Sequence, residues 1–315
     1  MPDLQFFHPA SVDEAIDLLA TSPLPVDSPT QRRIRTDDNL REYFASGRRR
    51  PEWVWAVRYD DDPKPLGVVG AFGSPAGKPF ILDVFGLPSD PEVARELIRL
   101  ASREAVAGGA EEVEIFAPTG ATLGSTSLAR LVDPLRDAGW RLLVERRHYE
   151  FEPPRGLAEE ERTTLSFDRL DDPDDPRLAA CHREVMRNTL DAYDRSVVDR
   201  LGFDEACHES LAFLLGEAPV AAVHLANDPA GRVVGLVSGL LRPHGRGVVM
   251  FVGVAHDHRG RGYGRQLLAW QTRQLVDSGA TVLIADTDNT NLPMARAFAD
   301  VGWPQTESRI DLVPV

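Results

Sequence analysis

The sequence predicts an α/β (α+β) protein built from two similar domains, each a mixed, mostly antiparallel sheet flanked by helices. The main observation is an order of segments that occurs twice: a helix ending in Gly-Ala, an apolar strand, a second helix ending in Gly-Trp, and a final strand. In both halves a hairpin pattern precedes this order. A repeat spacing of roughly 165 residues is typical of a duplicated domain, because solenoid repeats are far shorter.

The duplicated segments share the residues that end their helices. REAVAGGA at Arg103–Ala110 corresponds to RQLVDSGA at Arg273–Ala280, and ARLVDPLRDAGW at Ala129–Trp140 corresponds to ARAFADVGW at Ala295–Trp303. Glycine ends helices because it adopts a left-handed conformation without steric penalty. Each half is expected to read strand, two helices, three antiparallel strands, helix, strand, helix, strand. The three antiparallel strands are expected at Trp53–Arg58, Leu66–Phe72 and Phe80–Phe85, and again at Pro219–Ala226, Val233–Leu241 and Val248–Val254.

A Pro-rich, charged segment without an apolar face, Glu152–Arg162, is expected to link the halves. The expected domains are therefore residues 1–153 and 163–315. The two cysteines, Cys181 and Cys207, are too few for a disulfide framework. Each precedes a histidine, but the C-x-x-C pairs typical of structural zinc sites are missing from the sequence, so we expect no metal.

The composition indicates a globular protein with an acidic surface. Of 315 residues, 43% are hydrophobic and 27% are charged, and the net charge is −14. Since like charges repel, this balance argues against binding to nucleic acid or anionic membranes and leaves room for a cationic partner. The sequence has no basic, apolar leader and no apolar run of about 18 residues. We expect a cytoplasmic protein, as a monomer or a homodimer.

A glycine-rich segment follows an apolar strand in the second half. Val248–Val254 has the composition of a strand buried on both faces, and it leads through His256–Arg265 into an amphipathic helix at Gln266–Val276. Glycines let a ligand approach the backbone, and the free N–H groups and dipole of a helix N-terminus attract anions. The three arginines of the segment suit a diphosphate.

Several kinds of site contain such a glycine-rich segment. A mononucleotide P-loop is excluded because Gly-Lys-Ser/Thr is missing from the segment. A dinucleotide fingerprint is excluded because it follows the first strand of a βαβ unit, not the last strand of an antiparallel run. A coenzyme A pyrophosphate loop and a purely structural glycine turn remain.

Two motifs of the second half resemble the signatures of the GCN5-related N-acetyltransferase (GNAT) superfamily. V-x-V-x-H-D-x-R-G-R-G-Y-G, from Val252 to Gly264, is similar to the family's R/Q-x-x-G-x-G/A pyrophosphate loop. N-x-x-x-A-x-x-F-x-x-x-G-W, from Asn291 to Trp303, is similar to its N-x-x-A-x-x-x-Y-x-x-x-G-F helix. The resemblance covers the second half, with both motifs in the family's order.

The resemblance implies that acetyl-CoA is the cosubstrate and that its pantetheine arm pairs with the splayed fourth strand. The Val252 and Val254 backbones then bind the arm, and one N–H there polarises the acetyl carbonyl. Asn291 is then expected to contact the pantetheine from the other side; capping of its own helix is the alternative, and the two roles are compatible. The residues implied in binding acetyl-CoA are Val252, Gly253, Val254, Arg259, Gly260, Arg261, Gly262, Tyr263, Gly264, Arg265 and Asn291.

The first half resembles a second, degenerate GNAT domain. FGLPSD at Phe85–Asp90 occupies the place of the pyrophosphate loop, and it contains proline and aspartate but no arginine. We therefore expect it to bind a diphosphate poorly. The doubled arrangement is similar to that of tandem GNAT proteins with one active half, mycothiol synthase among them.

The expected catalytic groups depart from the family pattern. Phe298 stands where many relatives carry a tyrosine that protonates the leaving thiolate, and phenylalanine has no proton to donate. The fourth strand has no carboxylate, which leaves Asp286 and His256 as candidate general bases. Asp286 also fits a solvated strand-end carboxylate, and His256 also fits a turn residue.

The acceptor is expected at Asn188–Arg195, the connection that lines the acceptor side in the family. Asp191, Tyr193 and Asp194 offer two anions and an aromatic face for a cationic amine, although the aspartates also fit helix caps. The sequence therefore predicts an acetyl-CoA-dependent N-acetyltransferase for a small cationic amine, such as an aminoglycoside-like or mycothiol-precursor-like compound. The alternative is a non-catalytic, coenzyme-A-binding sensor or scaffold.

Overall fold

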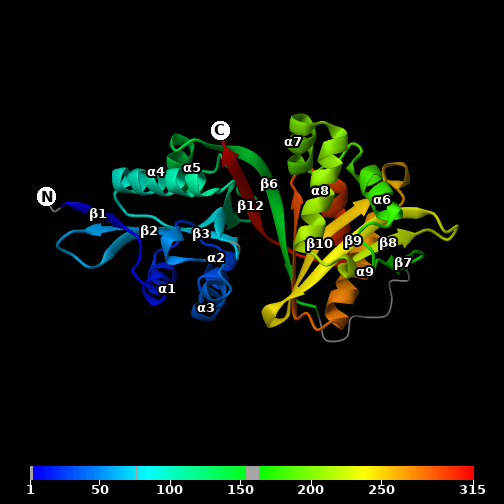
Figure 1. Ribbon diagram of the computed structural model, residues 1–315, viewed down its shortest axis with the longest axis horizontal. Coiled ribbons are helices and arrows are strands. Elements are labelled where there is room, and N and C mark those ends of the chain that lie inside the picture. The colour runs from blue at the N-terminus through cyan, green and yellow to red at the C-terminus, as the bar shows by residue number, and fades with distance from the viewer. Residues whose placement is uncertain (1–2, 76, 154–162) are drawn as a thin grey trace. The chain divides into compact units, whose positions relative to one another are not determined.

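The computed structural model describes residues 3–75, 77–153 and 163–315 (Figure 1). The chain forms two compact units: the first comprises Met1–Glu145 and Glu307–Val315, and the second comprises Arg146–Thr306. From position 154 onward, the expected linker lies outside the described residues. The two units differ from domains divided at that linker, because the last strand of the chain belongs to the first unit.

The first unit contains a sheet with the strand order β1-β2-β3-β4-β5-β12. These neighbours pair antiparallel except β4 and β5, which are parallel. Helices α4 and α5 lie on one face of this sheet and α1 to α3 lie on the other (Figure 1). The elements are β1 (Leu4–Phe7), α1 (Val12–Thr21), α2 (Pro29–Ile34), α3 (Asp37–Ala45), β2 (Val54–Tyr59), β3 (Pro65–Ser74), β4 (Lys78–Gly86), α4 (Pro91–Gly108), β5 (Glu112–Pro118), α5 (Ala129–Asp137) and β6 (Trp140–Phe151).

The second unit contains a sheet with the strand order β6-β11-β10-β9-β8-β7. Again one neighbouring pair, β10 and β11, is parallel, while the pairs around it are antiparallel. In chain order after β6, the elements are β7 (Ser166–Arg169), α6 (Pro176–Met186), α7 (Ala192–Leu201), α8 (Phe203–Glu217), β8 (Val223–Asn227), β9 (Val233–Arg242), β10 (Arg246–Val254), α9 (Tyr263–Asp277), β11 (Val282–Asp288), α10 (Leu292–Val301) and, belonging to the first unit from Glu307 onward, β12 (Gln305–Pro314).

Alternation of side chains along the strands places helices on both faces of each sheet. In β2, Val54 and Ala56 pack in the core that α1 and α3 cover, whereas Trp55 and Val57 pack in the core beneath α4. In the second unit, Leu236 packs with α6 and α8, while the next residue of β9, Val237, packs with α9. In the described part of the chain, no helix combines the length and hydrophobicity needed to cross a membrane.

The duplicated order of segments is confirmed. The glycines of the Gly-Ala and Gly-Trp helix ends all adopt a positive φ: Gly109 (107°), Gly279 (100°), Gly139 (89°) and Gly302 (88°). The expectation of two helices after the first strand of each half is wrong, since three are present in both units. In the second half, Gly202 at φ 80° separates α7 from α8 and so divides one apparent helix into two.

The final strands do not stay within the halves that encode them. Residues 140–145 of β6 belong to the first unit, and the remainder of the strand pairs with β11 in the second. Conversely, β12 pairs with β5, and its fully buried Ile310 and Leu312 complete the core of the first unit. Local patterns identify these segments as strands, but tertiary packing selects the strand with which each one pairs.

Candidate functional site

A gap opens between two parallel strands of the second unit. β10 and β11 pair from Arg246 only as far as Val248, and a bulge follows at Met250 in the pairing of β10 with β9. We expected β10 to be buried on both faces, and this is wrong: only Gly247 and Gly253 are buried. Beyond Val248, β10 has no paired neighbour on the β11 side.

The backbone of β10 presents hydrogen-bonding groups to this gap. The N–H of Ala255 donates to Val234 O at 2.9 Å and therefore faces β9. Alternate residues face the same way, so Gly253 also faces β9, whereas Val252 and Val254 face the gap. Within the described ranges, no side chain hydrogen-bonds to the Val252 backbone. These are the two residues at which we expected backbone contacts with a pantetheine arm.

The glycine-rich segment forms an open loop before α9. Gly260 and Gly262 both have φ 76°, and a Cβ added to either would meet no atom within 4 Å. Conformation, not lack of space, therefore requires glycine at these positions. Gly262 is the N-cap residue of α9, and no side chain caps this helix. The N–H groups of its first turn are thus available to an anion, with the exposed Arg261 and Arg265 beside them.

The side chain of Arg259 does not extend toward these N–H groups. Its Nη2 donates to Val185 O at 2.7 Å, its Nη1 to Asn188 O at 2.9 Å, and its Nε to Val254 O at 3.3 Å. Burial lowers the pKa of this guanidinium. The side chain that we expected at the diphosphate is therefore hydrogen-bonded to carbonyls of α6, of the segment that follows α6, and of β10.

The second motif forms the N-terminus and buried face of α10. Asn291 caps the helix by accepting from Met294 N at 3.2 Å, which is the simpler of the two roles expected for it. Phe298 is buried and stacks on Tyr149 of β6, with ring centroids 4.0 Å apart. Burial raises the pKa of Tyr149. Phe298 therefore belongs to the apolar core, together with Trp303.

The two expected general bases differ in their surroundings. Asp286 on β11 lies opposite His148 of β6, and its Oδ1 is 2.8 Å from His148 Nδ1. His256 begins a short 3₁₀ turn, His256–His258, and its Nδ1 is buried without a hydrogen-bond partner among the described residues. The structure does not bring these two side chains into a hydrogen bond with each other, and Asp286 is the one with an imidazole partner.

Two anchors fix the segment expected to bind the acceptor. Asp191 caps α7 by accepting from Tyr193 N at 2.9 Å and Asp194 N at 3.1 Å, and its other oxygen is 2.8 Å from Arg146 Nη1. The buried Asp288, at the end of β11, accepts from the next residue of the segment, Ala192 N, at 3.1 Å. Asp191 thus has the capping role that we considered as an alternative, whereas 40% of Tyr193 is exposed.

Asp194 is held by hydroxyl groups. It accepts from Thr189 Oγ1 at 3.3 Å and from Ser210 Oγ at 3.5 Å, and it forms no salt bridge with any described residue. Burial, followed by the charge of Asp191, raises the pKa of Asp194 to about 7. Ser210 in turn lies 3.3 Å from His182 Nε2, and burial lowers the pKa of that histidine to about 4. Near neutral pH, the carboxylate of Asp194 can therefore bind a cation or take up a proton.

Four residues of this region were not predicted from the sequence: Arg146, His148 and Tyr149, which line it from β6, and Asp288. A pattern confined to one half contains no signal for the β6 residues, because that strand is encoded in the other half. Among the described residues, no group of histidine, cysteine and carboxylate side chains is arranged to hold a metal ion. Cys181 and Cys207 are buried free thiols.

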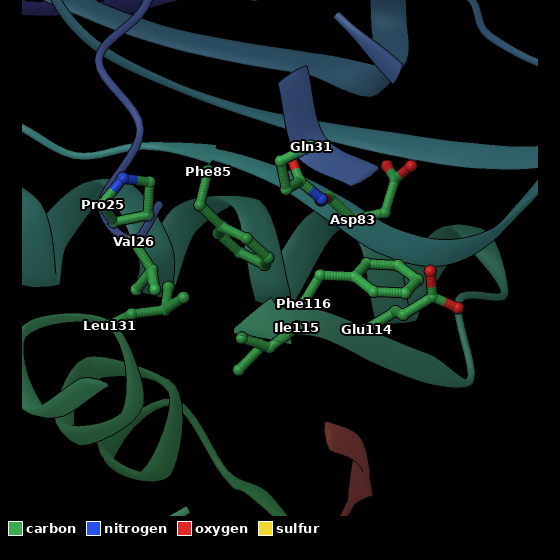
Figure 2. A pocket seen from close by; sticks show the side chains of 9 residues that line it. All are labelled: Pro25, Val26, Gln31, Asp83, Phe85, Glu114, Ile115, Phe116 and Leu131. Carbon is green, nitrogen blue, oxygen red and sulfur yellow. The ribbon is translucent and has the colours of Figure 1, made fainter. Parts of the chain in front are cut away.

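The first unit has the same gap, but its own side chains fill it. β4 and β5 pair only at Ile81 and Leu82, and a bulge follows at Asp83. Gln31 Nε2 donates to Asp83 O and Arg35 Nη2 donates to Phe85 O, each at 2.7 Å. Figure 2 shows Gln31 and the Phe85 ring beside the small cavity that remains between the strands. This gap has little room for a coenzyme arm.

The helix that follows this gap also differs from its counterpart. Asp90 caps α4 by accepting from Glu92 N at 2.8 Å and from Val93 N at 3.4 Å. A carboxylate therefore occupies the position at which an anion would bind, and it would repel a diphosphate. Poor binding of a diphosphate at Phe85–Asp90 stays a prediction, and the Asp90 cap is the observation that supports it.

The chain shares sequence with one protein family and its fold with several solved structures. Residues 179–303 match the model of the acetyltransferase (GNAT) family. A search of curated proteins finds no significant match. A GCN5-related N-acetyltransferase from Sphaerobacter thermophilus is 16% identical, with a TM-score of 0.60, over 99% of this chain and 96% of that one. A tandem GNAT protein from the clavulanic acid biosynthesis pathway is 15% identical, with a TM-score of 0.56, over 98% of both chains.

Proposed function

We propose that the chain transfers an acetyl group from acetyl-CoA to the amine of a small cationic acceptor, because residues 179–303 match the model of the GNAT acetyltransferase family and the whole chain is similar in fold to a tandem GNAT protein. The main support is the uncapped, glycine-rich N-terminus of α9 beside the gap between β10 and β11. Anion-binding amides and an open strand edge are the two features that a pyrophosphate joined to an amide-containing arm requires.

Different residues of this region bind different parts of the cosubstrate. The amides around Gly260, Gly262 and Gly264 bind the pyrophosphate, with Arg261 and Arg265 as cationic contacts. The Val252 backbone pairs with the pantetheine arm. The N–H of Val254 donates to the acetyl carbonyl and stabilises the negative charge that develops there. These roles agree with the direction in which the backbone of β10 faces.

The acceptor amine lies near Asp194 and Asp286 in this proposal. Asp194 binds the ammonium group, because it is the carboxylate of the segment Asn188–Arg195 without a salt bridge among the described residues. Asp286, supported by His148, removes the proton, with His256 as the second candidate base. The neutral nitrogen then bonds to the acetyl carbon, the carbon–sulfur bond breaks, and the nitrogen releases its second proton to water. Phe298 donates no proton, so the thiolate departs unassisted and takes up this proton from the water.

Calorimetric titration with acetyl-CoA, followed by a thiol-release assay over a panel of amines, tests the proposal. We expect one binding site per chain and thiol release that depends on a cationic amine. The panel includes aminoglycosides and amino sugars related to mycothiol precursors, with neutral alcohols of similar size as controls. Failure to bind acetyl-CoA contradicts the proposal outright.

A second candidate function is that of a coenzyme-A-binding sensor or scaffold without catalysis. The observations that favour it are the buried Phe298 in place of a proton donor and the lack of a carboxylate on β10. The same experiment separates the two functions. Tight binding of acetyl-CoA without thiol release from any amine supports the sensor, whereas amine-dependent release supports the transferase.

A further inference from the structure

The side chain of Arg259 connects three separate parts of the second unit. Its donors reach Val185 O in the last turn of α6, Asn188 O in the segment after α6, and Val254 O at the end of β10. The last carbonyls of a helix have no partner within the helix, so a cation there is favourable. A planar guanidinium with several fixed donors reaches all three carbonyls at once, which a lysine ammonium does not.

Asn188 has a left-handed backbone conformation. Its φ of 48° lies in the region that, after glycine, asparagine adopts most readily. Its carbonyl accepts from Arg259 Nη1 at 2.9 Å. Three residues further on, Asp191 is fixed to Arg146, and Ala192 is fixed to Asp288. The segment is therefore anchored at its start by Arg259, a residue of the glycine-rich loop, and in its middle by Arg146 and Asp288.

We propose, on the basis of the function proposed above, that Arg259 is a positioning residue that couples the coenzyme loop to the acceptor segment Asn188–Arg195. Binding of coenzyme A restrains the loop, and Arg259 transmits this restraint to the segment that presents Asp194. The two neighbouring arginines of the motif thus have different roles. Arg261, which is exposed and donates only to Asp257 O at 3.2 Å among the described residues, contacts the diphosphate, and Arg259 does not.

The test compares wild type, Arg259→Gln, Arg259→Lys and the matched control Arg261→Gln. Calorimetry with coenzyme A measures affinity, and amide hydrogen exchange over residues 188–195 measures the order of the segment. In wild type, saturating coenzyme A is expected to slow exchange in this segment by about 10-fold. Arg259→Gln is expected to keep its coenzyme affinity within about 3-fold of wild type but to lose this protection, and Arg259→Lys to recover only part of it.

Arg261→Gln is expected to show the opposite pattern. Its affinity for coenzyme A falls by about 10-fold, while the segment is fully protected once the site is saturated. If Arg259→Gln instead lowers the affinity as much as Arg261→Gln does, Arg259 is a phosphate ligand and the inference is overturned. If wild type binds no coenzyme A, the proposed function fails. The hydrogen bonds of Arg259 are then tested without ligand. Amide hydrogens of residues 188–195 must still exchange faster in Arg259→Gln than in wild type.

Discussion

The two units contain the same gap between parallel strands, and they differ in what satisfies its backbone. In both, the first of the two parallel strands has a bulge in its antiparallel pairing on the other side, at Asp83 in the first unit and at Met250 in the second. Two residues later, the carbonyl of Phe85 accepts from Arg35, whereas no described side chain bonds to the Val252 backbone. An open strand edge therefore becomes a binding site only where side chains of the protein do not bond to its backbone polar groups.

The helix N-termini repeat this difference in charge. α4 is capped by the carboxylate of Asp90, whereas α9 begins at Gly262 without a side-chain cap. One carboxylate of each unit differs as well. Asp83 is paired with Arg49 through two hydrogen bonds, but Asp194 contacts only hydroxyl groups among the described residues. In the first unit, a side chain thus caps the helix and an arginine pairs with the carboxylate. Among the described residues, the second unit has both an open anion site and a carboxylate without a salt bridge.

The largest expected effect comes from closing the open loop. Gly262→Leu places a side chain at φ 76°, which strains the loop and turns the amides away from the ligand. We expect the Kd for acetyl-CoA to rise by at least about 100-fold, equivalent to about 2.7 kcal/mol. Isothermal titration calorimetry measures this change directly.

Gly279→Leu is the matched control for this variant. Gly279 lies beyond the other end of α9, has φ 100°, and likewise leaves space for a Cβ. Comparable strain is therefore introduced away from the loop, and acetyl-CoA affinity is expected to stay within about 3-fold of wild type. Equal losses of affinity in both variants would remove the evidence that the loop binds the pyrophosphate.

A smaller effect is expected from opening the gap of the first unit. Arg35→Met preserves much of the side-chain volume but removes the donors to Phe85 O and to Ser22 O. One buried and one partly buried carbonyl then lack partners, and we expect the free energy of unfolding to fall by about 2.5 kcal/mol. Urea denaturation, followed at several probes, measures this loss.

The comparison also predicts what Arg35→Met does not do. Acetyl-CoA binding is expected to remain at one site per chain with unchanged affinity, because Asp90 still caps α4. A second binding site in this variant would contradict this expectation. It would show that the first unit has a functional cleft, which Arg35 covers in wild type. Arg41→Met, on the exposed surface of α3, serves as the control and is expected to leave the urea midpoint nearly unchanged.

The parts of the fold that the sequence predicts are those encoded locally. The helix ends at Gly109 and Gly279 follow from the conformational freedom of glycine, and the strands before them follow from runs of apolar residues. The loop before α9 was predictable for the same reason, since its glycines, arginines and following helix are contiguous in the chain.

The parts that escaped prediction depend on distant segments. No local pattern indicates that β12 completes the first unit, or that Arg146 and His148 of β6 contact Asp191 and Asp286. The role of Arg259 escaped for a related reason. An arginine in a phosphate-binding motif suggests a phosphate ligand, but the carbonyls with which it bonds lie about 70 residues earlier, at the end of α6.

The smallest effect we predict concerns the unpaired carboxylate of the second unit. The charged or titratable groups near Asp194 are Asp191, Arg146, His182 and Cys207. Its pKa is raised from 3.8 to about 7, so the folded state favours the protonated form. A raised carboxyl pKa contributes stability that is complete below about pH 4 and is lost as the pH rises to about 7. The paired Asp83 of the first unit has its charge compensated by Arg49.

Asp194→Asn removes this titration, because an amide does not ionise. The difference between 3.8 and about 7 corresponds to about 4 kcal/mol, and we expect about 2 kcal/mol because the side chain keeps partial solvent contact. Urea denaturation at pH 4 and pH 8 should therefore show the variant gaining stability relative to wild type as the pH rises. Asp199→Asn, exposed on the same helix, should follow wild type. Parallel profiles for Asp194→Asn and wild type would mean that the Asp194 charge is already compensated, and the contrast with Asp83 would then fail.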